Sequence, residues 1–375
     1  MTKKHTPLGV QEGFFSKPTE ASRRKLQIAV GYFESYVNVL ARGREVGYAD
    51  LFAGPGRYEN GEKSVPLAVC EKVVADERLR SLVRLWFNEA DPNLAAQLEH
   101  NIQKVDGIAA LRYEPRVTKK VISTALAPRL ERLSIPTFTF ADPCGYKGLS
   151  LRLITAALKG FGNDCLFFFN YNRVNMKLGY PVMDESINEF FERERAAALR
   201  AEVGDLTVPD REKRVLAAIE EALRRAGAVP LTFAFRTREG GGTSHHLVFA
   251  SKSRKGTAIM KNLMNRASSE IVEGVGSSAY DPRDEGTHQM DLFAGLYEVR
   301  ERALSVFAGR VLPFDQIVGE EMDATRYTES NYRDALLELE AEGRVAMDPP
   351  ATERPMRAGG VKRTLPGKTR ITFPR

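Results

Sequence analysis

Short apolar runs alternate with helical patterns along the first half of the chain, and this alternation limits the fold more than any other feature of the sequence. The runs are too short for helices, and continuous apolar runs of this length are typical of strands that are buried on both faces. They predict strands at 47–52, 82–87, 136–140 and 165–169, with helices at 19–42, 65–75, 92–105, 117–133 and 149–158 around them. Because βαβ crossovers produce parallel strands, the sequence predicts an α/β fold with a Rossmann-like sheet.

The alternation changes in the second half of the chain. A charge-rich, mostly helical stretch over 180–228 predicts an insertion rather than another βα unit. Two β-rich runs at 231–235 and 246–250 are joined by a glycine-rich loop and predict a hairpin that ends the sheet antiparallel. A helix at 256–267 closes this domain.

The C-terminal part has a different pattern. Residues 271–290 contain glycines, serines and an Asp-Pro pair, which predicts a linker. Helices are then predicted at 296–307, 314–320 and 329–342, and strands at 344–347 and 369–373. Helices followed by a two-stranded wing favour a winged helix. We therefore expect a Rossmann-like domain over 1–270, a linker over 271–290 and a winged-helix-like domain over 291–375.

Composition narrows the class of protein. The 375 residues include 55 Lys and Arg against 49 Asp and Glu, a net charge of +6 that suits a polyanionic partner but is also common in proteins that bind no nucleic acid. The 3 cysteines lack the Cys/His spacings of zinc or iron–sulfur sites, so no metal is expected. No apolar run approaches the roughly 18 residues of a membrane span, and the N-terminus lacks a secretory signal. We expect a cytoplasmic protein without a membrane partner.

The most informative motif is Asp50-Leu51-Phe52-Ala53-Gly54-Pro55-Gly56, in which an apolar strand runs directly into two glycines one residue apart. Such glycines let the backbone approach a ligand closely. Phe-x-Gly-x-Gly with an acid just upstream is similar to the first motif of class I methyltransferases, in which the acid faces the methionine portion of S-adenosylmethionine. The third glycine of a dinucleotide fingerprint and the Gly-Lys-Ser/Thr of a phosphate loop are absent, which disfavours NAD and ATP. The predicted cofactor-binding residues of this loop are Asp50, Phe52, Ala53, Gly54 and Gly56.

An acid that could accept both ribose hydroxyls is expected at the end of the second strand, where Glu89 and Asp91 stand. We prefer Glu89 as the cofactor ligand and interpret Asp91 as the N-cap of the following helix. The spacing from the glycines exceeds the usual twenty or so residues. It requires an enlarged first crossover over 58–80.

The strand at 136–140 leads into Asp142-Pro143-Cys144-Gly145-Tyr146. This loop resembles the Asp-Pro-Pro-Tyr loop of amino-methyltransferases, whose carboxylate and carbonyl orient the nucleophilic amine. The catalytic candidates are Asp142, Pro143 and Tyr146. Cys144-Gly145 departs from that pattern, and this departure disfavours amine methylation. Pro-Cys is also found in cytosine-C5 methyltransferases, where the thiolate attacks the ring, but the Glu-Asn-Val segment of those enzymes is absent, and Cys144 is better interpreted as a small loop residue.

A polar cluster, Asn170-Tyr171-Asn172-Arg173, follows the strand at 165–169. Asn170 and Arg173 are candidate substrate-binding residues at the same edge of the sheet. A loop whose Asn side chains satisfy their own backbone explains the cluster equally well. His245 and His246 begin a strand and point to opposite faces, so structural roles are expected for both.

Four segments together resemble the three-Cys-motif partner family. They are 50–56, 142–146, His246-Leu-Val-Phe-Ala leading to Lys261-Asn-Leu-Met, and Tyr327-Thr-Glu-Ser-Asn-Tyr. Members of this family are similar to methyltransferases and are named for a radical-SAM-like partner that carries the three cysteines. The resemblance implies a cofactor pocket at Asp50, Gly54, Gly56 and Glu89, a reactive edge at Asp142, and iron–sulfur chemistry in the partner rather than in this chain.

Two functions remain open. Seven Lys or Arg residues against one acid over 353–375 favour DNA or RNA binding, whereas the acids of the helix at 329–342 disfavour base reading by that helix. The first hypothesis is an S-adenosylmethionine-dependent methyltransferase that acts on nucleic acid together with the three-cysteine protein. The second is a noncatalytic subunit that brings nucleic acid to that protein.

Overall fold

The computed structural model describes residues 15–143, 148–172, 185–237, 242–269, 271–272, 275–282, 295–356 and 363–375. The chain divides into two compact units, Met1–Met260 and Lys261–Arg375. The division falls inside helix α11 (Arg254–Ala267), somewhat before the boundary expected at residue 270. Among the described residues, no helix combines the length and the apolar character needed to cross a lipid bilayer.

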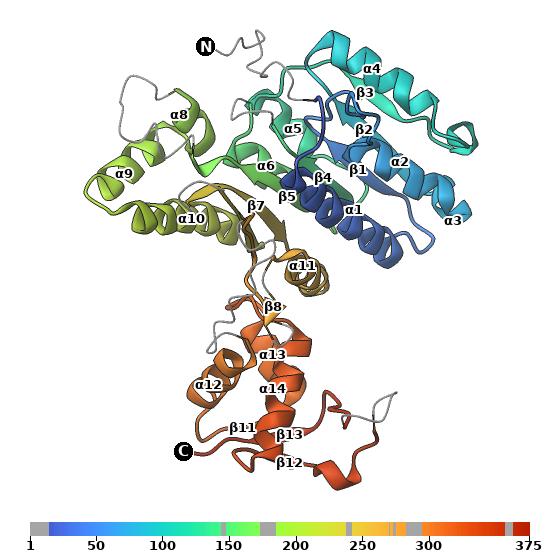
Figure 1. The fold of residues 1–375 in the computed structure, drawn as a ribbon. Helices are drawn as coiled ribbons and strands as arrows, with labels where there is room; N and C mark the ends of the chain where they lie inside the picture. Colours follow the sequence, from blue (N-terminus) through green and yellow to red (C-terminus); the bar gives the residue numbers. More distant parts are fainter. Residues whose placement is uncertain are drawn as a thin grey trace. The chain divides into compact units, whose positions relative to one another are not determined.

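The first unit is built on a mixed β-sheet (Figure 1). Its strands lie in the order β6-β7-β5-β4-β1-β2-β3. The strands β1 to β5 pair in parallel, whereas β7 is antiparallel to both β5 and β6. A parallel sheet that ends in an antiparallel hairpin confirms the Rossmann-like, class I methyltransferase type of fold predicted from the sequence. The strands are β1 (Val46–Asp50), β2 (Val83–Asn88), β3 (Arg116–Thr118), β4 (Thr137–Ala141), β5 (Asp164–Phe169), β6 (Val229–Arg236) and β7 (Thr243–Ser251).

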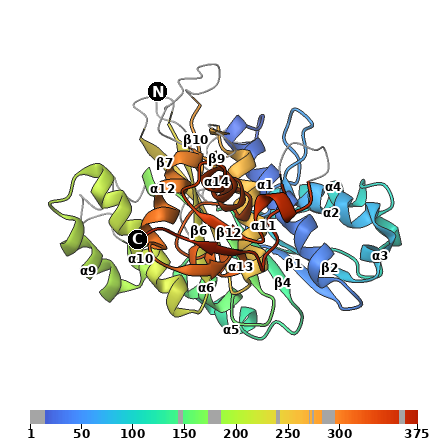
Figure 2. The same cartoon turned by 90° about the horizontal axis from the view of Figure 1, so that it is seen from below.

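Helices cover both faces of this sheet. On one face, the centre of the Tyr32 ring of α1 (Glu20–Leu40) lies 5.0 Å from the centre of the Phe138 ring and 4.6 Å from that of the Phe249 ring. On the other face, α6 and α10 bury their apolar stripes against β5 and β7. The helices α8, α9 and α10 fall within the predicted insertion, at the opposite end of the sheet from α2, α3 and α4 (Figure 1). Figure 2 shows the same separation of α9 and α10 from α2, α3 and α4 in a second view. These helices are α2 (Val65–Ala75), α3 (Glu77–Arg80), α4 (Pro92–Gln103), α5 (Ala127–Leu130), α6 (Leu151–Ala157), α8 (Glu185–Phe191), α9 (Arg193–Val203) and α10 (Val208–Arg225).

The prediction of a helix at 117–133 is wrong. The segment begins in β3, which pairs in parallel with β2 through Val117 and Phe87. The short turns η2 (Thr124–Leu126) and α5 follow it, and η1 (Ile108–Ala110) precedes it. Without β3, one edge of β2 would leave its backbone groups unpaired, so sheet pairing overrides the apolar periodicity of the segment.

The second unit packs helices against a small antiparallel sheet of order β11-β13-β12. Its core includes Phe307, Ile317, Leu336 and Ile371, all nearly fully buried. Thr328 and Asn331 form a reciprocal capping box that fixes the start of α14. The strand β11 was not predicted. The elements are β8 (Ile271–Val272), β9 (Val275–Gly276), β10 (Ala279–Tyr280), α12 (Leu296–Val306), β11 (Val311–Pro313), α13 (Phe314–Glu321), α14 (Glu329–Ala341), β12 (Ala346–Asp348), η4 (Ala351–Glu353) and β13 (Arg370–Thr372).

Candidate functional site

The two glycines of the loop after β1 have different surroundings. Both adopt positive φ angles, +63° at Gly54 and +79° at Gly56, which favour glycine. A Cβ at Gly54 would lie 3.1 Å from the ring of Phe15, at the wall of a cavity, whereas a Cβ at Gly56 would lie 2.8 Å from Leu98. The first glycine therefore leaves room beside the cavity, and the second allows the loop to pack on the core.

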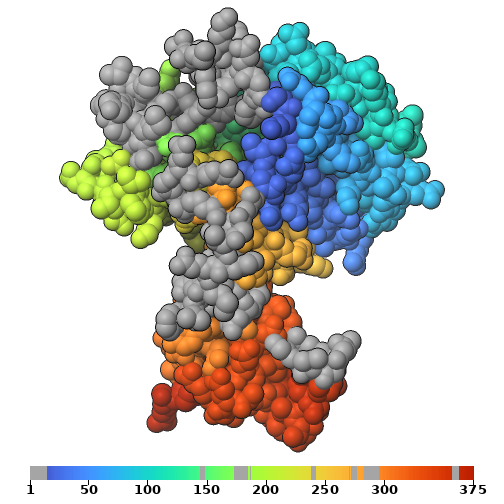
Figure 3. Space-filling view, in the orientation of Figure 1, coloured from blue at the N-terminus to red at the C-terminus, as the bar shows by residue number. Residues whose placement is uncertain are grey.

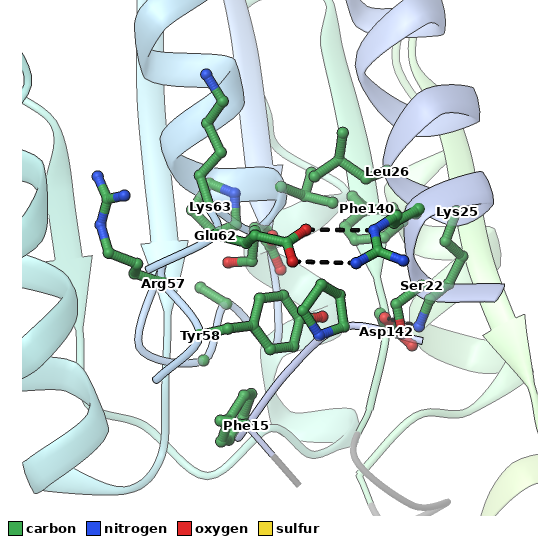
Figure 4. A pocket seen from close by; sticks show the side chains of 18 of the residues that line it. Phe15, Ser22, Lys25, Leu26, Arg57, Tyr58, Glu62, Lys63, Phe140 and Asp142 are labelled. Carbon is green, nitrogen blue, oxygen red and sulfur yellow. Dashed lines mark hydrogen bonds and ion pairs between the residues drawn. The ribbon is translucent and has the colours of Figure 1, made fainter. Parts of the chain in front are cut away.

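The cavity lies at the carboxyl ends of β1 and β4 and has a volume of about 580 Å³. This volume is within the range of about 300–1,000 Å³ that is common for small-molecule sites. Figure 4 shows side chains converging on it from α1, from the loop after β1 and from the end of β4. Five of the predicted site residues line it, namely Asp50, Phe52, Ala53, Gly54 and Asp142.

Asp50 is the most perturbed carboxyl group of this cavity. Its side chain is only 1% exposed, and one oxygen accepts the Phe52 N–H at 3.0 Å while the other accepts the Tyr48 hydroxyl at 3.4 Å. It forms no ion pair within the part of the chain that the structure describes. Burial, together with the nearby carboxylates of Asp142 and Glu89, raises the pKa of Asp50 to about 8. A cationic ligand would restore the ionised form.

Glu89 follows β2 and stabilises the glycine loop through a hydrogen bond. Its Oε2 accepts the Gly54 N–H and its Oε1 accepts the Asp91 N–H, both at 2.9 Å. Burial raises its pKa. The Asp91 carboxylate accepts the N–H groups of Asn93 and Leu94, which confirms the predicted N-cap of α4. Glu89 is not among the residues that line the cavity, so ribose binding by Glu89 remains a prediction.

Asp142 forms an ion pair with Lys25 of α1, which the sequence reasoning missed. The Lys25 ammonium also lies 4.2 Å from the centre of the Phe168 ring of β5. A signal was present in the sequence, because Lys25 stands at helical spacing from Ala29 and Tyr32 and so places a cation on the face of α1 that carries the buried stripe. A cation on an apolar stripe needs an anionic partner, and here that partner is the predicted catalytic acid.

A second ion pair also lines the cavity. The guanidinium of Arg23 donates to both carboxylate oxygens of Glu62, at 3.0 and 3.2 Å (Figure 4). This pair joins α1 to the loop after β1, and in Figure 3 the dark-blue residues of α1 meet the lighter-blue loop region at the surface. The carbonyl of Phe15 accepts the Glu59 N–H at 2.8 Å and holds the aromatic ring over the loop.

The other predicted residues have mixed outcomes. Pro143 is buried beside Asp142, and Asn170 is half-buried at the end of β5. Cys144, Tyr146 and Arg173 lie outside the described residues.

Both histidines of β7 make contacts that are consistent with structural roles. The His245 ring stacks 4.9 Å from Phe235 on the neighbouring strand β6. His246 Nε2 lies 2.9 Å from a carboxylate oxygen of Glu212, and this contact ties the insertion helix α10 to the sheet.

No protein-family model and no curated protein matches the chain. The chain is similar to a Legionella pneumophila protein of the DUF519 family, with 11% identity, 60% of this chain and 83% of that chain covered, and a TM-score of 0.35. It is similar to a precorrin-6y C5,15-methyltransferase from Geobacter metallireducens, with 14% identity, 61% and 87% coverage and a TM-score of 0.28. It is also similar to the DszA carbon methyltransferase, with 10% identity, 64% and 57% coverage and a TM-score of 0.40.

Proposed function

We propose that the first unit binds S-adenosylmethionine and transfers its methyl group. The observation that carries this proposal is the buried Asp50 carboxyl, which borders the cavity at the end of β1 and has no cationic partner among the described residues. S-adenosylmethionine has an ammonium and a sulfonium group, and either would supply the missing positive charge. The residues of the cavity therefore fit this cofactor.

In this proposal Asp50 binds the ammonium of the methionine portion, and the glycine loop runs beneath it. Glu89 keeps Gly54 in position through its backbone N–H. The aromatic side chains of Phe15, Phe52 and Phe140 exclude water from the cavity wall. The cofactor, when bound, supplies an electrophilic methyl group, and Asp142 lies at the edge where an acceptor would enter.

Calorimetric titration with S-adenosylmethionine and S-adenosylhomocysteine tests the proposal. Gly54→Asp places a carboxylate at the cavity wall and should abolish binding. Gly43→Asp is the matched control, because Gly43 has a similarly positive φ of +79° but open space around its Cβ position. Micromolar binding that is lost only in Gly54→Asp supports the proposal, and a wild-type protein that binds neither ligand contradicts it.

We further propose that the second unit is a winged-helix module that binds nucleic acid. The order helix, strand, helix, helix, strand, strand supports a winged helix. Lys368, Arg370 and Arg375 are exposed, but Arg354 is only 1% exposed and pairs with Glu340, so it cannot reach a phosphate. Charge reversal at Lys368 and Arg370 should weaken binding of a fluorescent oligonucleotide and flatten its salt dependence. An unchanged affinity would contradict this role.

The acids of α14 are less repulsive than their number suggests. Glu338 and Glu342 pair with Arg300 of α12, and Glu329 pairs with Arg333. These ion pairs reduce the negative field that the sequence implied for this helix.

The resemblance to the three-Cys-motif partner family extends the proposal to a complex with a radical-SAM-like protein, in which this chain acts on nucleic acid or delivers it. The departure from Asp-Pro-Pro-Tyr at Cys144 is the observation that supports delivery as the alternative to catalysis. Asp142→Ala separates the two, because only an enzyme should lose turnover while it keeps cofactor binding.

A further inference from the structure

The ion pair between Lys25 and Asp142 differs from an ordinary surface ion pair. Exposed pairs contribute little to stability and are held loosely. Here the two side chains are only 15% and 24% exposed, and the ring of Phe168 lies against the ammonium at 4.2 Å. The carboxylate and the ring together fix the ammonium at the wall of the cavity, next to the loop that follows β4.

Both groups of this pair keep hydrogen-bonding capacity. An ammonium has three N–H donors, and a carboxylate has two acceptor oxygens. Lys25 donates to Oδ2 of Asp142. Within the described ranges, no other hydrogen bond engages the Lys25 ammonium or the Oδ1 atom of Asp142. A donor and an acceptor are therefore available side by side at the edge of the cavity.

We propose that Lys25 and Asp142 activate the methyl acceptor and that this acceptor is a hydroxyl group rather than an amine, an inference that rests on the proposed methyltransferase function. A hydroxyl oxygen can accept a hydrogen bond from the ammonium while its proton is donated to Oδ1. A neutral amine has a single lone pair, and an ammonium that donates to this lone pair would block its attack.

The proton and the electrons balance in such a transfer. The hydroxyl proton passes to Asp142 while an electron pair of the hydroxyl oxygen forms the new bond to the methyl carbon. The bond between that carbon and sulfur breaks, and the sulfur keeps the bonding pair. Lys25 remains an ammonium and stabilises the negative charge that develops on the oxygen, and Asp142 then releases the proton to water.

A hydroxyl acceptor also indicates which nucleic acid, RNA or DNA, is the substrate. Within a polynucleotide, the 2′-hydroxyl distinguishes RNA from DNA and is both a donor and an acceptor. The geometry at Lys25 and Asp142 thus points to the ribose of RNA as the acceptor, with Phe140 and Phe168 of the adjacent strands as the apolar surroundings.

The first test needs no acceptor. Calorimetry compares the affinity for S-adenosylmethionine with that for the uncharged S-adenosylhomocysteine in the wild type, Lys25→Met and Asp142→Asn. The quantity of interest is the affinity for S-adenosylmethionine divided by the affinity for S-adenosylhomocysteine. If the pair faces the reacting carbon, loss of the ammonium should raise this ratio about fivefold, and loss of the carboxylate should lower it by a similar factor. Lys72→Met, which removes the Lys72–Glu34 ion pair outside the cavity, is the matched control and should leave the ratio unchanged.

An unchanged ratio in both Lys25→Met and Asp142→Asn would overturn the placement of the pair at the reacting carbon. A wild-type protein that binds neither ligand would instead contradict the proposed function, so the two failures can be told apart.

The second test identifies the acceptor. Wild type and variants are incubated with methyl-labelled S-adenosylmethionine and total RNA or DNA, and the nucleic acid is digested to nucleosides. The expected product is 2′-O-methyl nucleoside from RNA, reduced about a hundredfold or more in Lys25→Met and unchanged in Lys72→Met. Label in N-methyl bases or in DNA, or transfer that does not depend on Lys25, would overturn the inference.

Discussion

Two carboxyl groups line the cavity at the ends of the neighbouring strands β1 and β4, and they are held in opposite ways. At the end of β1, Asp50 is 1% exposed, and within the described part of the chain it has no cation beside it. At the end of β4, Asp142 is partly exposed and is paired with Lys25. Asp50 therefore keeps its proton near neutral pH until a cation binds, whereas Asp142 is paired with a cation before any ligand arrives. This difference underlies our proposal that Asp50 binds the cofactor and that Asp142 acts on the acceptor.

The largest expected effect concerns cofactor affinity. Asp50→Asn keeps the shape of the side chain but removes the charge, and hydrogen bonds to charged groups contribute about 1.5–3 kcal/mol. We expect the affinity for S-adenosylmethionine to fall by about 10- to 150-fold in calorimetry. Asp142→Asn should lower the affinity for S-adenosylmethionine by less than about tenfold, because Asp142 already has a cationic partner. Equal losses of affinity in both variants would contradict the different roles proposed for Asp50 and Asp142.

The second effect is the pH dependence of binding. Because the pKa of Asp50 is raised to about 8, the group is mostly protonated at pH 6 and must lose its proton when a cation binds. The affinity should rise about tenfold between pH 6 and pH 7 and level off near pH 8, where an α-amino group begins to lose its own charge. In Asp50→Asn the same titrations should be nearly flat. A wild-type affinity that is independent of pH would show that Asp50 binds no cation.

The position of this site could be predicted from the sequence because it depends on local rules. The segments that precede Asp50 and Asp142 are short and apolar, and the carboxyl ends of parallel strands meet at one edge of the sheet. The two glycines after β1 also marked the loop correctly. Strand periodicity and turn chemistry were sufficient for this part of the fold.

The partners of these residues could not be predicted in the same way. Lys25 reaches Asp142 across 117 positions of the chain, and Glu89 reaches the Gly54 N–H across 35. Such contacts depend on how helices and strands pack in three dimensions. A local pattern can show that a buried charge needs a partner, but it does not identify which residue the partner is. The burial of Arg354 against Glu340 has the same origin, and it removes one of the seven cations that a count along the sequence assigned to nucleic acid.

The third effect is on stability. In the unfolded chain Asp50 loses its proton near its ordinary pKa of 3.8, but in the folded protein it keeps the proton until about pH 8. Between these values the folded state binds more protons, so the contribution of Asp50 to stability decreases as the pH rises. Relative to Asp50→Asn, the wild type should lose about 1 kcal/mol per pH unit between pH 5 and pH 7.

Urea unfolding followed by the fluorescence of Trp86, the single tryptophan of the chain, reports on the first unit. Parallel pH profiles for the wild type and Asp50→Asn would contradict a raised pKa at this position.

The smallest effect separates the two ion pairs that α1 forms across the cavity. Lys25 and Asp142 are 15% and 24% exposed, whereas Arg23 and Glu62 are 50% and 42% exposed. Solvent weakens the exposed pair, so Arg23→Met should leave the free energy of unfolding nearly unchanged. Lys25→Met leaves a carboxylate without its partner in a less hydrated place and should cost about 1–2 kcal/mol. The same fluorescence measurement compares the two variants. If Arg23→Met lowers the free energy of unfolding as much as Lys25→Met does, the Lys25–Asp142 pair is no better protected from solvent than the Arg23–Glu62 pair. The choice of Lys25 and Asp142 as the reactive pair would then lose its support.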